Sequence, residues 1–155
     1  MKPNPSEAGK RIKQLRLSCG FTMEELGRKI DNSPRATISG SHLSNSPKST
    51  IATWESGRNI PSQKKLQLIA IVGETTTDWI KWGTLEEYIT SYLIGIGYEL
   101  YIKDFPEIPH KVFKDIQERY SDTFSLDKDY ELLNPIIKNI FTKYYSKEFE
   151  VTQIP

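Results

Sequence analysis

Apolar side chains near the start of the chain recur at the spacing of an amphipathic helix. Ala8, Ile12 and Leu15 lie four and three positions apart, which places them on one helical face. Basic residues fill much of the remaining surface of this stretch, and Gly20 follows it as a residue type that commonly ends helices. The pattern predicts a first helix over about residues 8–17.

A second helix is predicted over residues 23–30, where Leu26 and Ile30 share a face. Thr22 precedes it and Glu25 follows three positions later, which is the spacing of a capping box. A glycine between the two apolar residues would let another backbone approach closely. These features are typical of a tightly packed pair of helices.

The next segment, residues 31–46, is poor in apolar residues and rich in Ser, Asn and Gly, as loops are. It holds the stretch NSPRATI at residues 32–38, and a similar stretch, NSPKSTI, lies at residues 45–51. Each has a Ser before a Pro, then a basic residue and a closing Thr-Ile pair, which is typical of the first turn of a short helix. A third helix is predicted to start at one of them.

Two further short helices complete the first half of the chain. Ser62 can cap a helix whose apolar residues form a stripe and which ends at Gly73. Another is predicted from about residue 77 to Gly83, and it carries two tryptophans.

The second half, residues 84–155, is also predicted to be mainly helical. A first apolar stripe starts at Leu85, a second helix follows the prolines near residue 109, and a third starts near residues 126–129 with Pro135 in a first turn or at a kink. Residues 98–102 alternate between apolar and polar positions, so a strand is an alternative there. The chain is therefore predicted to be all-α, with domains at 8–83 and 84–155.

The composition is that of a soluble globular protein, with 37% hydrophobic and 26% charged residues in a chain of 155. No apolar run approaches the roughly 20 residues of a membrane helix, and the N-terminus lacks the apolar stretch of a signal peptide. The single cysteine, Cys19, cannot form a disulfide within the chain. We therefore expect a cytoplasmic protein with no membrane partner.

Charge divides the chain into unlike halves. Residues 1–83 carry 13 Lys and Arg against 7 Asp and Glu, a net charge of +6, whereas residues 84–155 carry 8 against 13, a net charge of −5. A basic half favours a polyanion such as a nucleic acid, and the acidic half favours a different partner. Chance clustering of solvated charges is the alternative.

Several segments, in order, resemble the Cro/CI-type (XRE-type) helix-turn-helix domain. They read GKRIKQLR, GFTMEELGRKI, KSTIATWESGRNIPSQKKLQLIAIVG and TDWIKWG, and they cover about residues 8–83. STIATWESGRNIPS and the later DWIKWG are particularly similar to the DNA-binding domain of phage CI repressors. The resemblance implies a compact five-helix, lambda-repressor-like domain whose third helix enters the major groove of DNA while the second crosses the phosphate backbone.

The two similar stretches compete for the place of that third helix. In the family the third helix follows the second after about four residues, and this spacing favours NSPRATI. However, Ser39 and Gly40 follow the first stretch and would break a helix, whereas the second stretch continues to Trp54, a large apolar anchor. We therefore assign the second stretch to the recognition helix and interpret residues 32–46 as an inserted loop, which serves either as a tolerated surface loop or as a further DNA contact.

The resemblance also implies roles for individual residues. Three residues of the third helix are expected to contact base edges: Lys48, Ser49 and Thr53. Phosphate contacts are expected from Thr22, Arg35, Thr50, Arg58, Asn59 and Lys64, and Lys65 could extend them. Arg16 and Glu55 match an ion pair that ties the first helix to the end of the third in similar repressors. The alternatives are ordinary helix-starting residues and solvated surface charges. Met23 departs from the glutamine common in the family.

The expected function is a sequence-specific transcriptional repressor of phage or mobile-element type in a bacterial cell. It would bind a palindromic operator on double-stranded DNA as a homodimer formed through residues 84–155, where a protein antirepressor could also dock. The alternative is an antitoxin that regulates its own gene and binds a basic toxin with its acidic half. Two histidines, His42 and His110, and one cysteine do not make a metal site, and no phosphate-binding loop is present. No enzymatic activity, cofactor or metal is expected.

Overall fold

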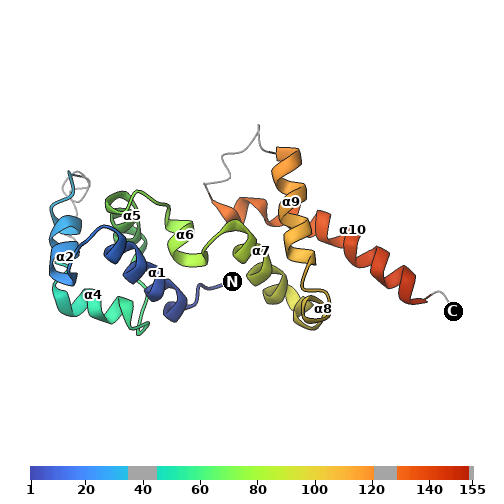
Figure 1. Ribbon diagram of the computed structural model, residues 1–155, viewed down its shortest axis with the longest axis horizontal. Coiled ribbons are helices and arrows are strands. Elements are labelled where there is room, and N and C mark those ends of the chain that lie inside the picture. The colour runs from blue at the N-terminus through green and yellow to red at the C-terminus, as the bar shows by residue number, and fades with distance from the viewer. Residues whose placement is uncertain (35–44, 121–128, 154–155) are drawn as a thin grey trace. The chain divides into compact units, whose positions relative to one another are not determined.

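The computed structural model describes residues 1–34, 45–120 and 129–153, and over these residues the chain forms helices and no strand (Figure 1). This confirms the prediction of an all-α protein. The chain divides into two compact units, Lys2–Gly83 and Thr84–Pro155, with Met1 grouped with the second. The division between the units falls after Gly83. No helix in the described part of the chain is both long enough and apolar enough to cross a membrane.

The described helices of the first unit are α1 (Pro5–Ser18), α2 (Met23–Asp31), α4 (Lys48–Glu55), α5 (Gln63–Val72) and α6 (Thr77–Trp82). Local caps explain most of their ends. Side-chain oxygens of Thr22, Ser62 and Thr76 accept hydrogen bonds from first-turn amides of α2, α5 and α6. Helix α1 begins three residues before the predicted start because Asn4 caps it and Pro5 occupies its first position.

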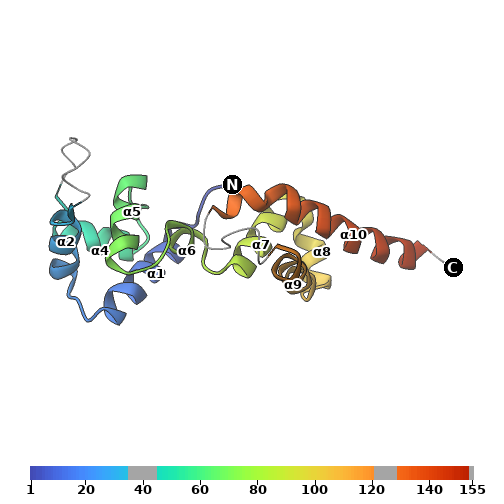
Figure 2. The same cartoon turned by 90° about the horizontal axis from the view of Figure 1, so that it is seen from above.

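The core of the first unit is built from the apolar stripes of these helices. Ile12, Leu26, Ile51 and Ile69 are completely shielded from solvent, and Trp54 is 6% exposed. Helix α4 packs against both α1 and α2, which lie beside it in two perpendicular views (Figure 2). The recognition-helix candidate is therefore part of the core rather than an appended segment.

Two glycines allow α1 and α2 to pack closely against the backbone of α4 and of the residues just before it. A Cβ atom added to Gly9 would lie 2.3 Å from the carbonyl oxygen of Trp54, and one added to Gly27 would lie 1.9 Å from that of Ser46. Any side chain at either position would clash with backbone atoms. The prediction that a glycine in the second helix permits a close approach is confirmed.

The second unit consists of α7 (Leu85–Leu93), a π-helical turn η1 (Ile94–Tyr98), α8 (Glu99–Asp104), α9 (Ile108–Tyr120), a 3-10 turn η2 (Tyr130–Leu133) and α10 (Asn134–Gln153). Helices α7, α9 and α10 pack against one another. Pro135 lies in the first turn of α10, as one of the two expectations for it required. The helix itself begins later than residues 126–129.

The strand alternative at residues 98–102 was wrong. Gly97 has a φ of +108° and interrupts the preceding helix, after which α8 begins at Glu99. The rings of Tyr98 and Tyr101, three positions apart, both contact Phe141 and Tyr145. Because the spacing of three returns to one helical face, the apparent alternation reflects packing against α10 rather than a strand.

Hydrogen bonds join the helices of the second unit. The Tyr88 hydroxyl donates to Asn134 Oδ1 at 2.6 Å, and the Tyr144 hydroxyl donates to Asp115 Oδ2 at 2.6 Å. The second bond, together with burial, raises the pKa of Tyr144 to about 12 from its ordinary value of 10.0.

Candidate nucleic-acid interface

Helix α4 buries one side and presents its polar first turn to solvent. Ile51 and Trp54, three positions apart, enter the core, while Lys48 and Ser49 are exposed and Thr53 is partly exposed. The interpretation that NSPKSTI starts a helix anchored by Trp54 is confirmed. Arg35 and His42, in the expected inserted loop, lie outside the described residues.

An ion pair fixes the C-terminal end of α4 to α1. The Arg16 guanidinium donates to the Glu55 carboxylate, with Nε 2.9 Å from Oε2 and Nη2 2.9 Å from Oε1. A third bond runs from Arg16 Nη1 to the carbonyl oxygen of Phe21 at 2.9 Å. The two side chains are only 9% and 4% exposed. The pair that the sequence suggested is therefore present, and it is buried and bidentate.

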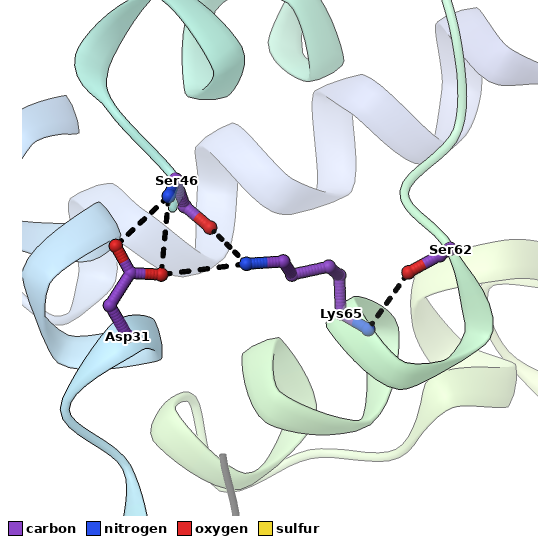
Figure 3. A network of polar contacts seen from close by, with 4 residues as sticks. All are labelled: Asp31, Ser46, Ser62 and Lys65. Carbon is purple, nitrogen blue, oxygen red and sulfur yellow. Dashed lines mark hydrogen bonds and ion pairs between the residues drawn. The ribbon is translucent and has the colours of Figure 1, made fainter. Parts of the chain in front are cut away.

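The N-terminal end of α4 is held differently. Pro47 is its N-cap residue and makes no side-chain capping bond. Ser46, one position earlier, is 2% exposed. Its backbone N–H donates to both oxygens of Asp31, the last residue of α2, at 2.9 and 3.2 Å. Its Oγ accepts a bond from Lys65 Nζ at 2.7 Å, and Lys65 Nζ also lies 3.4 Å from Asp31 Oδ1 (Figure 3).

This network corrects the expected role of Lys65. Its ammonium group points into the unit toward Asp31 and Ser46, and the residue is 6% exposed, so it does not extend a phosphate-binding surface. Its neighbour Lys64 is exposed. A basic residue at the start of a helix gave no local sign of burial, because its carboxylate partner lies 34 positions earlier in the sequence.

Two of the predicted hydroxyl contacts, from Thr53 and Thr22, already make hydrogen bonds within the chain. The Thr53 hydroxyl donates to the Ser49 carbonyl oxygen at 2.9 Å, which leaves a methyl group and an oxygen lone pair for a partner. The Thr22 hydroxyl accepts from the Glu25 amide at 3.1 Å and donates to Glu25 Oε1 at 3.2 Å. A phosphate contact from Thr22 would therefore compete with the Glu25 carboxylate. Thr50 is half-buried.

An open groove of about 620 Å³ runs between α2 and the start of α4. Its lining includes the cations Arg28 and Lys48 and the acids Glu24 and Asp31. Arg28, an exposed residue of α2, was not among the predicted contacts. The available signal was its position in the last turn of a helix that the family places across the DNA backbone. Arg58 and Asn59, which follow α4, are exposed as expected.

The described residues contain no cluster of three or more metal-ligating side chains. His110, outside this surface, has its Nδ1 3.0 Å from Glu86 Oε1 in an exposed pair. The chain matches no protein-family model, no curated protein and no solved structure.

Proposed function

We propose that Lys2–Gly83 is a lambda-repressor-like helix-turn-helix domain and that the chain is a sequence-specific transcriptional repressor of phage or mobile-element type. In this proposal α4 enters the major groove, and α2 crosses the phosphate backbone. The observation that carries it is the state of α4. Buried polar contacts hold the helix at both ends, through Glu55 and Ser46, while its first turn leaves Lys48 and Ser49 in solvent.

The distribution of charge supports the same surface. Arg28 and Lys48 line the groove beside α4, Arg58 follows α4 in the chain, and Lys64 lies in the first turn of α5; all four residues are exposed. The net charge of residues 1–83 is 13 − 7 = +6, so the unit attracts a polyanion. Exposed cations along one surface supply the affinity that does not depend on sequence and that falls as salt is added.

Base recognition would come from three polar residues of α4. Lys48 can donate to guanine O6 or N7, Ser49 can donate or accept, and the Thr53 methyl can contact thymine. Phosphate contacts would come from Thr50, Arg58, Asn59 and Lys64, with Thr22 and Arg35 as further candidates, and Arg28 joins this set.

We propose that Thr84–Pro155 provides self-association, because one module of this kind binds half of a palindromic site and two are needed for tight, specific binding. Large aliphatic side chains on this unit face solvent, among them Leu100 at 77% and Leu132 at 72% exposure. A dimer on a promoter operator in the bacterial cytoplasm would exclude RNA polymerase by steric blocking. Sedimentation of the full chain and of Leu100→Asp tests the dimer, which should dissociate more readily in the variant.

The experiment that tests DNA recognition selects duplexes from a random library with the full-length chain. We expect enrichment of a palindromic sequence, and the logarithm of its affinity should fall linearly with the logarithm of salt concentration. Lys48→Ala combined with Thr53→Ala should reduce discrimination between this sequence and random duplex. The control Lys81→Ala removes a cation from α6 and should preserve it. Failure of the wild-type chain to enrich any sequence would contradict the proposal.

A further inference from the structure

We propose that Ser46, held by Asp31, Lys65 and Gly27, is the anchor that positions the N-terminal end of α4 on the DNA. This rests on the proposed function, since α4 must be the helix that reads bases. It assigns positioning roles to Asp31, Ser46 and Lys65, none of which would touch the duplex.

A long stretch of sequence lies between the end of α2 and the start of α4. Asp31 ends α2, and the chain returns to described structure at residue 45, immediately before Ser46. Fourteen residues separate Asp31 from Ser46 in the sequence, so α4 does not follow α2 after a tight turn. The contacts of Ser46 are the described contacts that can fix the start of α4.

Three residues of two helices contact Ser46, and Figure 3 shows two of them, Asp31 and Lys65. Asp31 of α2 receives its backbone N–H, and Lys65 of α5 donates to its hydroxyl. Its carbonyl oxygen lies against Gly27, where a Cβ atom would come within 1.9 Å. Amide, hydroxyl and carbonyl of one residue are thus engaged on α2 and α5.

Buried polar contacts can fix the position of Ser46 more narrowly than apolar contacts could. An apolar contact tolerates sliding, whereas a charged hydrogen bond in a buried site has a narrow range of distance and angle. Ser46 is 2% and Lys65 6% exposed, so water does not easily replace these bonds. Since Pro47 follows directly as the N-cap of α4, a displacement of Ser46 moves Lys48 and Ser49 with it. Hydrogen bonds from these two residues to base edges depend on their position and would be lost if they moved.

Two readouts on the full-length chain test the anchor. In Asp31→Ala, hydrogen exchange should accelerate at the amide of Ser46. It should also accelerate at the amides of Thr50 and Ile51, which donate to the Pro47 carbonyl oxygen in the first turn of α4. Exchange at the core residue Ile12 should change much less. Asp31→Asn keeps an acceptor for the Ser46 amide and should show a smaller effect. This readout requires no DNA.

The second readout is the ratio of affinities for the selected operator and for random duplex. Asp31→Ala and Ser46→Ala should each lower this ratio about tenfold, which is the discrimination that about one good side-chain–base contact provides. The affinity for random duplex should stay nearly constant. The control Thr76→Ala removes the N-cap of α6 and perturbs the same unit away from Ser46. It should leave the ratio unchanged, so a general loss of stability is distinguished from a loss of position.

The outcomes separate the two proposals. If wild type selects an operator but Asp31→Ala lowers the affinity ratio no more than Thr76→Ala does, the anchor is refuted and the proposed function stands. If Asp31→Ala leaves exchange at Ser46 and α4 unchanged, the anchor is likewise refuted, whatever binds DNA. If wild type selects no operator, the proposed function fails, and the positioning role on DNA fails with it.

Discussion

Removing Glu55 tests whether the buried ion pair at the end of α4 contributes as much to the free energy of unfolding as its geometry implies. Glu55→Ala leaves the Arg16 guanidinium in a site where its side chain is only 9% exposed, and the Phe21 carbonyl oxygen is then its remaining hydrogen-bond partner among the described residues. Breaking a buried pair by removing one partner costs about 3–5 kcal/mol, because the remaining charge is uncompensated. Small domains are stable by about 5–15 kcal/mol, so the loss is a large share of the total.

The assay can isolate the first unit within the intact chain. All three tryptophans, Trp54, Trp79 and Trp82, lie in Lys2–Gly83, whereas all eight tyrosines lie after residue 84. Urea unfolding followed by tryptophan fluorescence therefore reports on the unit that contains α4. The matched control is Glu7→Ala, which removes an exposed ion pair with Lys10 in α1 and should cost under about 1 kcal/mol.

A double variant separates the cost of an unpaired buried charge from the contribution of the ion pair itself. Replacing both Arg16 by Met and Glu55 by Leu removes the pair without leaving a buried charge, so most of the stability should return. A deficit of about 1–3 kcal/mol should remain because the Phe21 carbonyl oxygen loses the guanidinium as a donor. A cost for Glu55→Ala as small as that of Glu7→Ala would refute the reasoning, since the pair would then behave like one on the surface.

Four further variants test other parts of the proposed DNA contacts and of the packing in the two units. Arg58→Ala should weaken binding to all duplexes alike and reduce the salt slope by about 1, measured by titration at several salt concentrations. Gly27→Ala should destabilise the first unit in the tryptophan-detected urea assay, because the added Cβ would lie 1.9 Å from a backbone oxygen. Arg35→Ala should change sequence preference less than Lys48→Ala does in a repeated selection; the reverse would mean that the first of the two similar stretches reads the bases. Since the folded-state pKa of Tyr144, about 12, exceeds its ordinary 10.0, its hydrogen bond stabilises the second unit below that ordinary value and loses effect as pH rises toward 12. Tyr144→Phe should remove a phenol that titrates near pH 12 from the ultraviolet absorbance titration, and an unchanged curve in that range would refute the assignment.

Local signals in the sequence were sufficient for the ends of most helices in the first unit. Thr22 and Ser62 do cap helices, and Gly20 and Gly83 follow helix ends with φ values of +75° and +85°. Each signal acts through hydrogen bonds or backbone freedom within a few residues, so it can be identified without the fold. Trp54 located α4 for a similar reason, since a large apolar residue at the end of a short helix has to be buried.

Features that depend on distant partners could not be predicted in the same way. Lys65 meets Asp31 across 34 positions, and nothing next to either residue in the sequence indicates that their charges are paired. Tyr98 and Tyr101 contact aromatic residues of α10. The sequence near these tyrosines was also compatible with a strand, and only this distant packing shows why the segment is helical. Arg16 and Glu55, 39 positions apart, were paired only because the resemblance to repressors supplied the match.

Methylation interference on the selected operator tests the central claim most directly, because it reports which groove α4 occupies. A methyl group on guanine N7 lies in the major groove, whereas one on adenine N3 lies in the minor groove. The account predicts that N7 methylation at particular guanines of each half-site blocks binding of the wild-type chain, and that Lys48→Ala becomes insensitive at one of them. Binding unaffected by N7 methylation, or blocked only by methylation at adenine N3, would contradict it.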